Sequence, residues 1–223
     1  MKTVIIYAAS IEQHGPHLAE LTDTALGYAQ ATDLAKRLGN ALVAPVIRPG
    51  LSEHHMAMPG SITLRPEVFT GLVEDYVSAY VKHGFDTIIL SSSHGGNFEA
   101  IEKIAENEAK KYPNVKIISG YGLKDLPAAL TGMERAEGLE AGACGGHACD
   151  YETSVMLMLD PKQVRMEKAE KGFMGLPSKE LIIRMMHEGI PAISKIGVMG
   201  DPTDANAERG ARYFKAAQDL QEK

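Results

Sequence analysis

Along this chain, short runs of β-branched and apolar residues alternate with longer segments in which apolar positions recur at helical spacing. The short runs predict four buried strands, Val4–Ala9, Ala41–Val46, Asp86–Ser92 and Val115–Ser119. The longer segments predict helices over residues 22–38, 66–83, 97–111, 152–159 and 204–221. Because strands that alternate with helices form βαβ units, the sequence predicts a three-layer α/β/α fold with a mostly parallel sheet.

Two segments, Leu123–Gly146 and Glu167–Ile196, have only weak periodicity. We expect them to be long functional loops or oligomer contacts. The chain has no internal repeat, low-complexity tract or Pro/Ser-rich linker, so residues 1–223 are predicted to form a single domain.

The overall charge and the cysteine content narrow the classes of partner. A net charge of -6 lacks the basic footprint that a general nucleic-acid binder needs to neutralise phosphates. No run approaches the roughly 20 apolar residues that cross a bilayer, so we expect neither a nucleic-acid nor a membrane partner. Two cysteines are too few for a disulfide framework, and a reducing, cytoplasmic location is expected.

The first chemical motif is Glu12-Gln13-His14-Gly15-Pro16-His17, with Asp23 at the start of the following helix. Glu12 and His14 are two residues apart, so in an extended segment their side chains point to the same side. Asp23 can return to that pocket and bridge two cations, a donor set that suits zinc, manganese or iron. The alternative is that Asp23 caps the helix while His14 is an ordinary polar turn residue.

The second motif is Ser93-His94-Gly95-Gly96-Asn97, which follows the strand Asp86–Ser92. Ligands in open α/β sheets collect outside the carboxyl ends of the strands, and this motif and the first both lie there. The glycines leave room for a metal or substrate, and Asn97 is placed to cap the next helix. The alternative is a plain strand-to-helix turn with a polar histidine.

Two further segments carry polar side chains of the same kinds. His147 lies on a glycine-rich approach to a helix that begins near Glu152. Cys144 and Cys149 lack the paired spacing of structural zinc sites, so buried thiols are the expected reading. In the segment 52–64, His55 precedes a Pro-Gly turn, which is either a solvated loop or a substrate contact.

Taken together, these segments resemble the creatininase (creatinine amidohydrolase) family. The resemblance rests on Glu-Gln-His-Gly-Pro-His-Leu with Asp23, on His55 ahead of residues 59–64, and on Ser-His-Gly-Gly-Asn at 93–97. It also includes residues 146–148, 152–154 and 197–203, in the order of the family and over nearly the whole chain. The resemblance implies a three-layer α/β fold, often assembled as a hexamer, with a binuclear metal centre that hydrolyses C–N bonds of amides.

The resemblance also implies roles for individual residues. Two divalent metal ions (Zn, Mn or Fe) are expected, one held by Glu12, Asp23 and His94. The other ion would be held by His14 and Asp23. Creatininase itself supplies a glutamate two residues after the loop histidine, where this chain has Gly96, so Glu152 is the candidate for the missing carboxylate.

The remaining site residues follow from the same resemblance. His147 and Glu152 are the expected catalytic residues, with His147 protonating the departing nitrogen or stabilising the oxyanion. His17 is expected to orient the metal loop. The predicted substrate contacts are His55, Ser93 and Asn97.

The predicted function is hydrolysis of a C–N amide bond in a small, possibly cyclic molecule by a metal-bridging hydroxide. The chain has no tryptophan, whereas tryptophans enclose creatinine in the namesake enzyme, which argues against creatinine as the substrate. The alternatives are hydrolysis of a C–C bond in a cyclic diketone, peptide cleavage, and a metal- or sugar-binding module without turnover.

Overall fold

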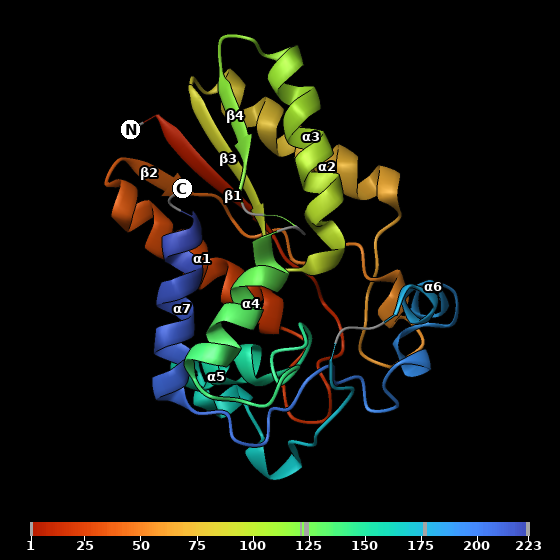
Figure 1. Cartoon of the computed structure of the whole chain (residues 1–223). Helices are drawn as coiled ribbons and strands as arrows, with labels where there is room; N and C mark the ends of the chain where they lie inside the picture. The colour runs from red at the N-terminus through yellow and green to blue at the C-terminus, as the bar shows by residue number, and fades with distance from the viewer. Residues whose placement is uncertain (1, 121, 123–124, 176–177, 222–223) are drawn as a thin grey trace.

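A four-stranded parallel sheet forms the centre of the computed structural model, which describes residues 2–120, 122, 125–175 and 178–221. The strands lie in the order β2-β1-β3-β4, and every neighbouring pair is parallel (Figure 1). Their bounds are β1 (Thr3–Ala8), β2 (Ala41–Val43), β3 (Thr87–Ser92) and β4 (Lys116–Ser119). β1 and β3 lie inside the sheet and end side by side, with Ala8 paired to Ser92.

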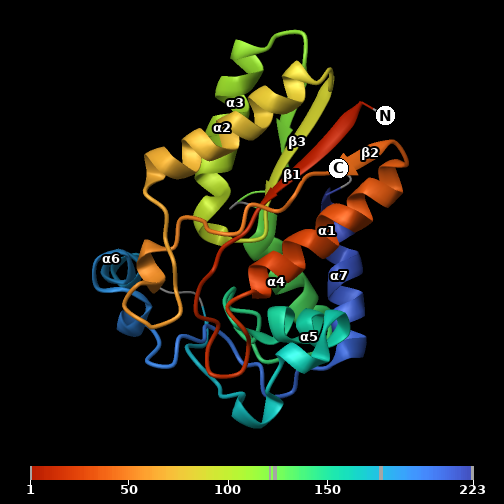
Figure 2. The same ribbon diagram turned by 180° about the vertical axis from the view of Figure 1, so that it is seen from behind.

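Helices cover both faces of this sheet, which confirms the predicted three layers. On one face, α2 (Pro66–Lys82) and α3 (Phe98–Lys111) bury apolar side chains against Val4, Ile6 and Ala8 of β1. The alternate β1 residues, Ile5 and Tyr7, pack against α1 (Thr22–Leu38) on the other face. Seen from behind, α1 crosses this face with α5 (Asp150–Leu159) and α7 (Ala207–Gln221) packed against it (Figure 2).

A buried ion pair fixes α5, the helix that carries Glu152, against α7. Arg209 Nη1 donates to Asp150 Oδ1 at 2.6 Å, and the hydroxyl of Tyr213 donates to Asp150 Oδ2 at 2.7 Å. The Asp150 side chain is almost fully buried, so these two bonds replace the water that its carboxylate has lost.

Two helices lie where loops were expected, so that expectation was wrong. α4 (Asp125–Ala136) falls within Leu123–Gly146, and α6 (Lys179–Glu188) falls within Glu167–Ile196. α4 contains Pro127 and Gly132, both poor helix formers, which hides its pattern. α6 places Ile182, Met185 and Met186 at i, i+3 and i+4, but the run is only 10 residues long. Residues 123–124 and 176–177 of these segments lie outside the described part of the chain.

Smaller differences affect the element bounds. β2 ends at Val43 rather than Val46, because Pro45 has no N–H to offer the sheet. α5 begins at Asp150 and α7 begins at Ala207, respectively earlier and later than predicted. Among the described residues, no helix has both the length and the apolar character to span a bilayer.

Candidate metal centre

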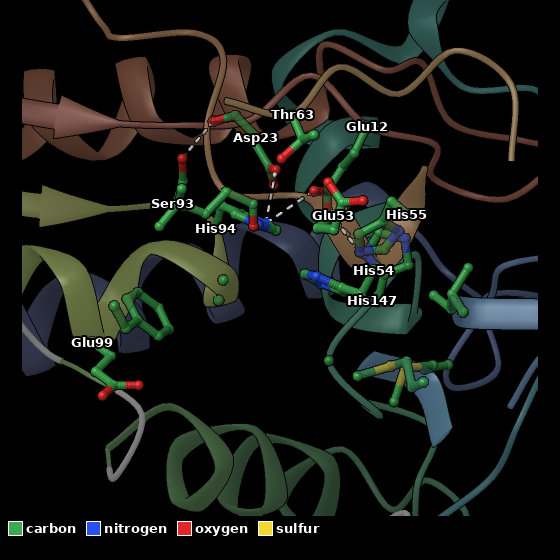
Figure 3. Close-up of a pocket in the computed structure, with 18 of the residues that line it drawn as sticks. Glu12, Asp23, Glu53, His54, His55, Thr63, Ser93, His94, Glu99 and His147 are labelled. Carbon is green, nitrogen blue, oxygen red and sulfur yellow. Dashed lines mark hydrogen bonds and ion pairs between the residues drawn. The ribbon is translucent and has the colours of Figure 1, made fainter. Parts of the chain in front are cut away.

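Four of the five predicted ligand residues, Glu12, Asp23, His94 and Glu152, line one cavity of about 960 Å³ at the carboxyl ends of β1 and β3. The fifth, His14, lies against Asp23 and Glu152. Figure 3 shows Glu12, Asp23, His94, His55 and His147 turned toward one another there. Each lies at a strand end, a helix start or a connecting turn, as expected where the ends of parallel strands meet. All five side chains are buried.

Glu12 follows β1 and is surrounded by histidines. Its Oε2 lies 3.2 Å from Nδ1 of His94, and its Oε1 lies 3.4 Å from Nε2 of His55. Oε1 also lies 3.5 Å from Nδ1 of His147, and the hydroxyl of Ser52 donates to Oε2 at 2.7 Å. Burial raises the pKa of Glu12, but the charges of His94, His55 and His147 together hold that pKa well below its ordinary value.

Asp23 lies between two histidines and presents one oxygen to each. Its Oδ1 is 3.6 Å from Nε2 of His14, and its Oδ2 is 3.5 Å from Nδ1 of His94. The alternative of a helix cap is wrong, because the cap position of α1 is Leu21 and no side chain bonds there. Burial and the charge of Glu12 raise the pKa of Asp23 to about 6, against the lowering effect of His14 and His94.

Main-chain carbonyl groups fix the proton position on both of these histidines. Nδ1 of His14 lies 3.1 Å from the carbonyl of Glu12, and Nε2 of His94 lies 3.1 Å from that of Leu51. A carbonyl only accepts, so in each neutral ring the proton is on the nitrogen that faces the carbonyl. The other nitrogen, Nε2 of His14 and Nδ1 of His94, is therefore bare and faces carboxylates. A histidine that binds a metal is held in this way.

The distances from Asp23 to His14 and to His94 are those expected between two ligands of the same metal ion. Ligands of a tetrahedral metal at about 2.1 Å lie roughly 3.4 Å from one another. The contacts of Asp23 with His14 and His94 are 3.6 and 3.5 Å. Among the described residues, Nε2 of His14 and Oδ2 of Asp23 are buried and have no hydrogen-bond partner. In a metal-free protein a proton takes the place of the cation: despite burial, Glu12 and Asp23 raise the pKa of His94 to about 9.

Glu152 comes from the first turn of α5 and completes the second group. Its Oε2 lies 3.7 Å from Nε2 of His14 and accepts a hydrogen bond from the main-chain N–H of Ala148. Ala148 has φ +50°, a conformation that few residues other than glycine adopt, and this turn aims its N–H at Glu152. At Gly96 a Cβ would lie 2.4 Å from both His94 Nε2 and the carbonyl oxygen of Leu51. The loop therefore has no space for a side chain at 96.

Within the described part of the chain, three groups of donor atoms result, each with its atoms within 4.8 Å of one another. They are Glu12 with Asp23 and His94, His14 with His147 and Glu152, and Glu12 with His55 and His147. The sequence predicted His55 only as a substrate contact and missed its approach to Glu12. A pairing of Ile11 with Ile62 brings the loop over Glu12, and no local pattern predicts that pairing.

Ser93 and Asn97 differ in where their polar atoms face. Ser93 lines the cavity and donates through its hydroxyl to the carbonyl of Asp23 at 2.7 Å. Asn97 is fully buried, accepts from the N–H of Leu51 at 2.9 Å and donates to the carbonyl of Ala9 at 3.0 Å. Its side chain makes no helix-cap bond, so that prediction was wrong, and it connects two loops below the cavity.

Two other predictions concern residues around the centre. Cys144 and Cys149 are free and buried, as expected, and burial raises the pKa of Cys144 to about 12. His17 is buried beside the centre, with Nε2 at 2.9 Å from the hydroxyl of Thr153. Burial and the charge of His14 lower the pKa of His17 to about 4.

Comparison with known proteins gives concordant results. The Creatininase family model (creatinine amidohydrolase) matches residues 1–221. A mycofactocin precursor peptide peptidase of Mycobacterium tuberculosis (strain CDC 1551 / Oshkosh) is 32% identical, over 97% of this chain and 82% of its own. A 3-dehydro-scyllo-inosose hydrolase of Thermotoga maritima is 26% identical, over 99% of this chain and 75% of its own. A solved structure described as creatininase Mn is 22% identical with a TM-score of 0.80, covers 98% of this chain and 88% of its own, and confirms the fold.

Proposed function

The chain belongs to the creatininase family, and on that premise we propose that it hydrolyses a C–N amide bond with the help of two divalent metal ions. The observation that carries the proposal is the placement of Asp23 between the bare nitrogens of His14 and His94. Lone pairs that face one another in a buried site are stable only with a cation or a proton between them.

The donor groups divide between two positions. Glu12, Asp23 and His94 would hold one ion, and His14, Asp23 and Glu152 would hold the other, with zinc, manganese or iron suited to both. Together the three carboxylates carry a charge of about -3, which offsets most of the charge of two divalent cations. When bound, such a pair of ions lowers the pKa of a shared water and polarises a carbonyl group.

The protein itself supplies a group that can transfer a proton. His147 lines the cavity beside Glu12 and His14, and burial together with the charges of His14 and His55 lowers its pKa well below the ordinary value. A neutral imidazole of this kind can carry a proton toward the departing nitrogen. Glu152 would serve as a ligand of the centre and as a negative charge beside His14.

The cavity supports a substrate larger than a single small ring. Its volume of about 960 Å³ is near the upper end of the range for small-molecule pockets, about 1,000 Å³. Away from the centre its walls are mostly apolar and include Leu26, Leu130, Tyr151, Ile182, Met185 and Met186. Several relatives at 31–34% identity are described as peptide peptidases, and together with the cavity they favour an amide within a peptide as the substrate class.

A direct test combines metal loading with a peptide mixture. Protein stripped with EDTA and reloaded with Zn²⁺ or Mn²⁺ is incubated with a tryptic digest in ¹⁸O-labelled water, and the products are identified by mass spectrometry. We expect new carboxyl groups that carry one ¹⁸O, and no turnover by the metal-free protein.

Two variants on the same helix control this experiment. Asp23→Ala should lose both metals and all turnover, whereas Asp33→Ala, which removes a carboxylate near the surface of α1, should keep both. Full metal content and turnover in Asp23→Ala would refute the bridging role. If no peptide were cleaved while a cyclic diketone was opened, the bond would be C–C, as the name of the Thermotoga maritima relative suggests.

A further inference from the structure

Gln13 lies between Glu12 and His14 in the chain, yet the metal centre described above does not use its side chain. The side chain is buried at 5% exposure, and its amide nitrogen lies 2.9 Å from Nδ1 of His55 and 2.9 Å from Nε2 of His147. The amide oxygen accepts a hydrogen bond from the main-chain N–H of Gly15 at 3.0 Å. Gln13 therefore lies between the two histidines that are outside both proposed metal positions.

The contact with Gly15 fixes which end of the amide faces the rings. A main-chain N–H can only donate, so the atom that faces Gly15 is the oxygen, and the nitrogen must face His55. That nitrogen can only donate, so Nδ1 of His55 is the acceptor. The proton of the neutral ring is then on Nε2 of His55, which points toward Oε1 of Glu12 at 3.4 Å.

A different group fixes the proton on His147. Its Nε2 lies 2.8 Å from the main-chain carbonyl of Gln13, which can only accept, so Nε2 of His147 is protonated. The amide nitrogen of Gln13 also lies 2.9 Å from this Nε2, but a lone pair there would face the carbonyl oxygen at 2.8 Å. The two hydrogens of the amide instead go to Nδ1 of His55 and to the carbonyl of Gly197 at 3.4 Å, so that each donor has an acceptor. Nδ1 of His147 is therefore bare, and it lies 3.5 Å from Glu12 Oε1.

The two rings thus present opposite groups to the centre. Their centroids are 4.4 Å apart, and both residues line the cavity. His55 presents an N–H, which cannot bind a cation, so this tautomer removes it from the ligand set although it lies close to Glu12. His147 presents a lone pair toward Glu12 Oε1 at 3.5 Å, and these two acceptors leave a place for the hydrogens of the attacking water.

We propose that Gln13 is a positioning residue: its side-chain amide holds His55 as a hydrogen-bond donor to Glu12, and its main-chain carbonyl holds His147 with the bare Nδ1 toward Glu12. The proposal rests on the proposed function for what the two rings then do. His147 enters the reaction as a base: its Nδ1 takes a proton from the attacking water as the new C–O bond forms. It returns that proton to the departing nitrogen as the C–N bond breaks, so it acts as an acid only in the second step.

Nitrogen NMR on protein labelled with ¹⁵N-histidine tests the proton positions directly, in metal-free and Zn²⁺-loaded samples. Protonated and bare ring nitrogens have well-separated shifts, and the spectra of His55→Gln and His147→Gln assign the two rings. In the unaltered protein we expect Nε2 to be protonated in both rings. A proton on Nδ1 of His55 or on Nδ1 of His147 in the unaltered Zn²⁺-loaded protein would overturn the proposal, and this measurement needs no variant at position 13.

Gln13→Glu separates the effect of the amide from that of the main chain. A carboxylate accepts instead of donating, so Nδ1 of His55 should gain a proton, while His147 keeps its proton on Nε2 because the main-chain carbonyl is unchanged. Gln30→Glu, at a buried glutamine that lines the cavity, should leave the proton positions of His55 as they were. A bare Nδ1 of His55 in Gln13→Glu would refute the role of Gln13. The expected tautomers in a protein that cleaves no amide would refute the proposed function alone.

Discussion

Replacing Glu152 by glutamine keeps the size of the side chain and removes its negative charge. In the structure the carboxylate accepts the N–H of Ala148 and lies 3.7 Å from the bare Nε2 of His14. The change therefore affects one of the two proposed metal positions, whereas Glu12, Asp23 and His94 of the other position are untouched. We expect the protein to bind about one metal ion per chain in place of two.

The size of the effect follows from the place of Glu152 in the ligand set. Loss of an outer partner of a metal ligand typically lowers metal affinity by about 10- to 100-fold. Loss of a carboxylate that binds the metal directly should lower metal affinity at least as much as the largest of these effects. We therefore expect the affinity of this position to fall by about 100-fold or more, roughly 2.7 kcal/mol. The position formed by Glu12, Asp23 and His94 should change by less than about 10-fold, because only a more distant charge is lost.

Isothermal titration of the metal-free protein with Zn²⁺, followed by elemental analysis after dialysis, measures both affinities. Glu99→Gln is the matched control, because Glu99 lines the same cavity but lies apart from the histidines and acids of the centre (Figure 3). Two tightly bound ions in Glu152→Gln, with both affinities as in the unaltered protein, would refute the assignment of Glu152 as a ligand.

The loop after β3 offers a second check on the same reasoning. Creatininase has a glutamate where this chain has Gly96, which suggests that Gly96→Glu could replace the carboxylate lost from position 152. A Cβ at Gly96 would lie 2.4 Å from the carbonyl oxygen of Leu51, so main chain would have to move before the new carboxylate could bind. The double variant Glu152→Gln/Gly96→Glu should therefore bind no more metal than Glu152→Gln. Recovery of the second ion would contradict this account of the loop.

Two further predictions concern stability. Gly197→Ala should lower the free energy of unfolding, measured in urea, by at least about 1 kcal/mol, because Gly197 has φ +76° and a Cβ there would lie 2.0 Å from Gln13 Oε1. Gly71→Ala is the control: Gly71 lies in α2, and a Cβ there would meet no atom within 4 Å. This second change should raise the free energy of unfolding by about 0.5–1 kcal/mol. Because the pKa of His17 is lowered to about 4 in the folded protein, it contributes stability that is present above pH 6.5 and lost as pH falls toward 4. Metal-free His17→Gln should therefore lose less of its melting temperature between pH 7 and pH 5 than the unaltered metal-free protein, and an equal or greater loss would contradict the sign.

Local pattern predicted the central elements well, for reasons that the structure makes clear. β1, α1, α2 and β3 are long or strongly apolar, and the glycines at 39 and 84 follow the ends of the two helices. The order of strands and the pairing of Ala8 with Ser92 depend on contacts between distant segments, which no local window contains. α4 was missed because Pro127 and Gly132 interrupt its pattern, and α6 was missed because a 10-residue helix with no buried residue has only a short apolar stripe.

The site residues also fall into those that local sequence could place and those that depend on contacts between distant segments. Glu12, His14, Asp23 and His94 could be grouped from sequence, because each follows a strand or opens a helix at the same edge of the sheet. Glu152 entered only through the resemblance to the family. The approach of His55 to Glu12 depends on how the segment 52–64 folds back over β1, and its contacts with Ser10 and Ile11 span some 40–50 residues of chain.

The elements that carry the proposed metal ligands are packed into the core, whereas part of the cavity wall lies on an exposed helix. Metal binding and choice of substrate therefore depend on different parts of the structure. The proposed ligands lie on or beside β1, α1, β3 and α5, elements packed into the core, with α5 further held by the ion pair of Asp150 with Arg209. Much of the apolar wall comes from α6, through Ile182, Met185 and Met186, and α6 has no buried residue among those described. Changes in α6 can therefore alter the shape of the cavity without moving a ligand. The ligands of the proposed metal centre therefore do not by themselves identify the substrate, in agreement with relatives that are named for different substrates.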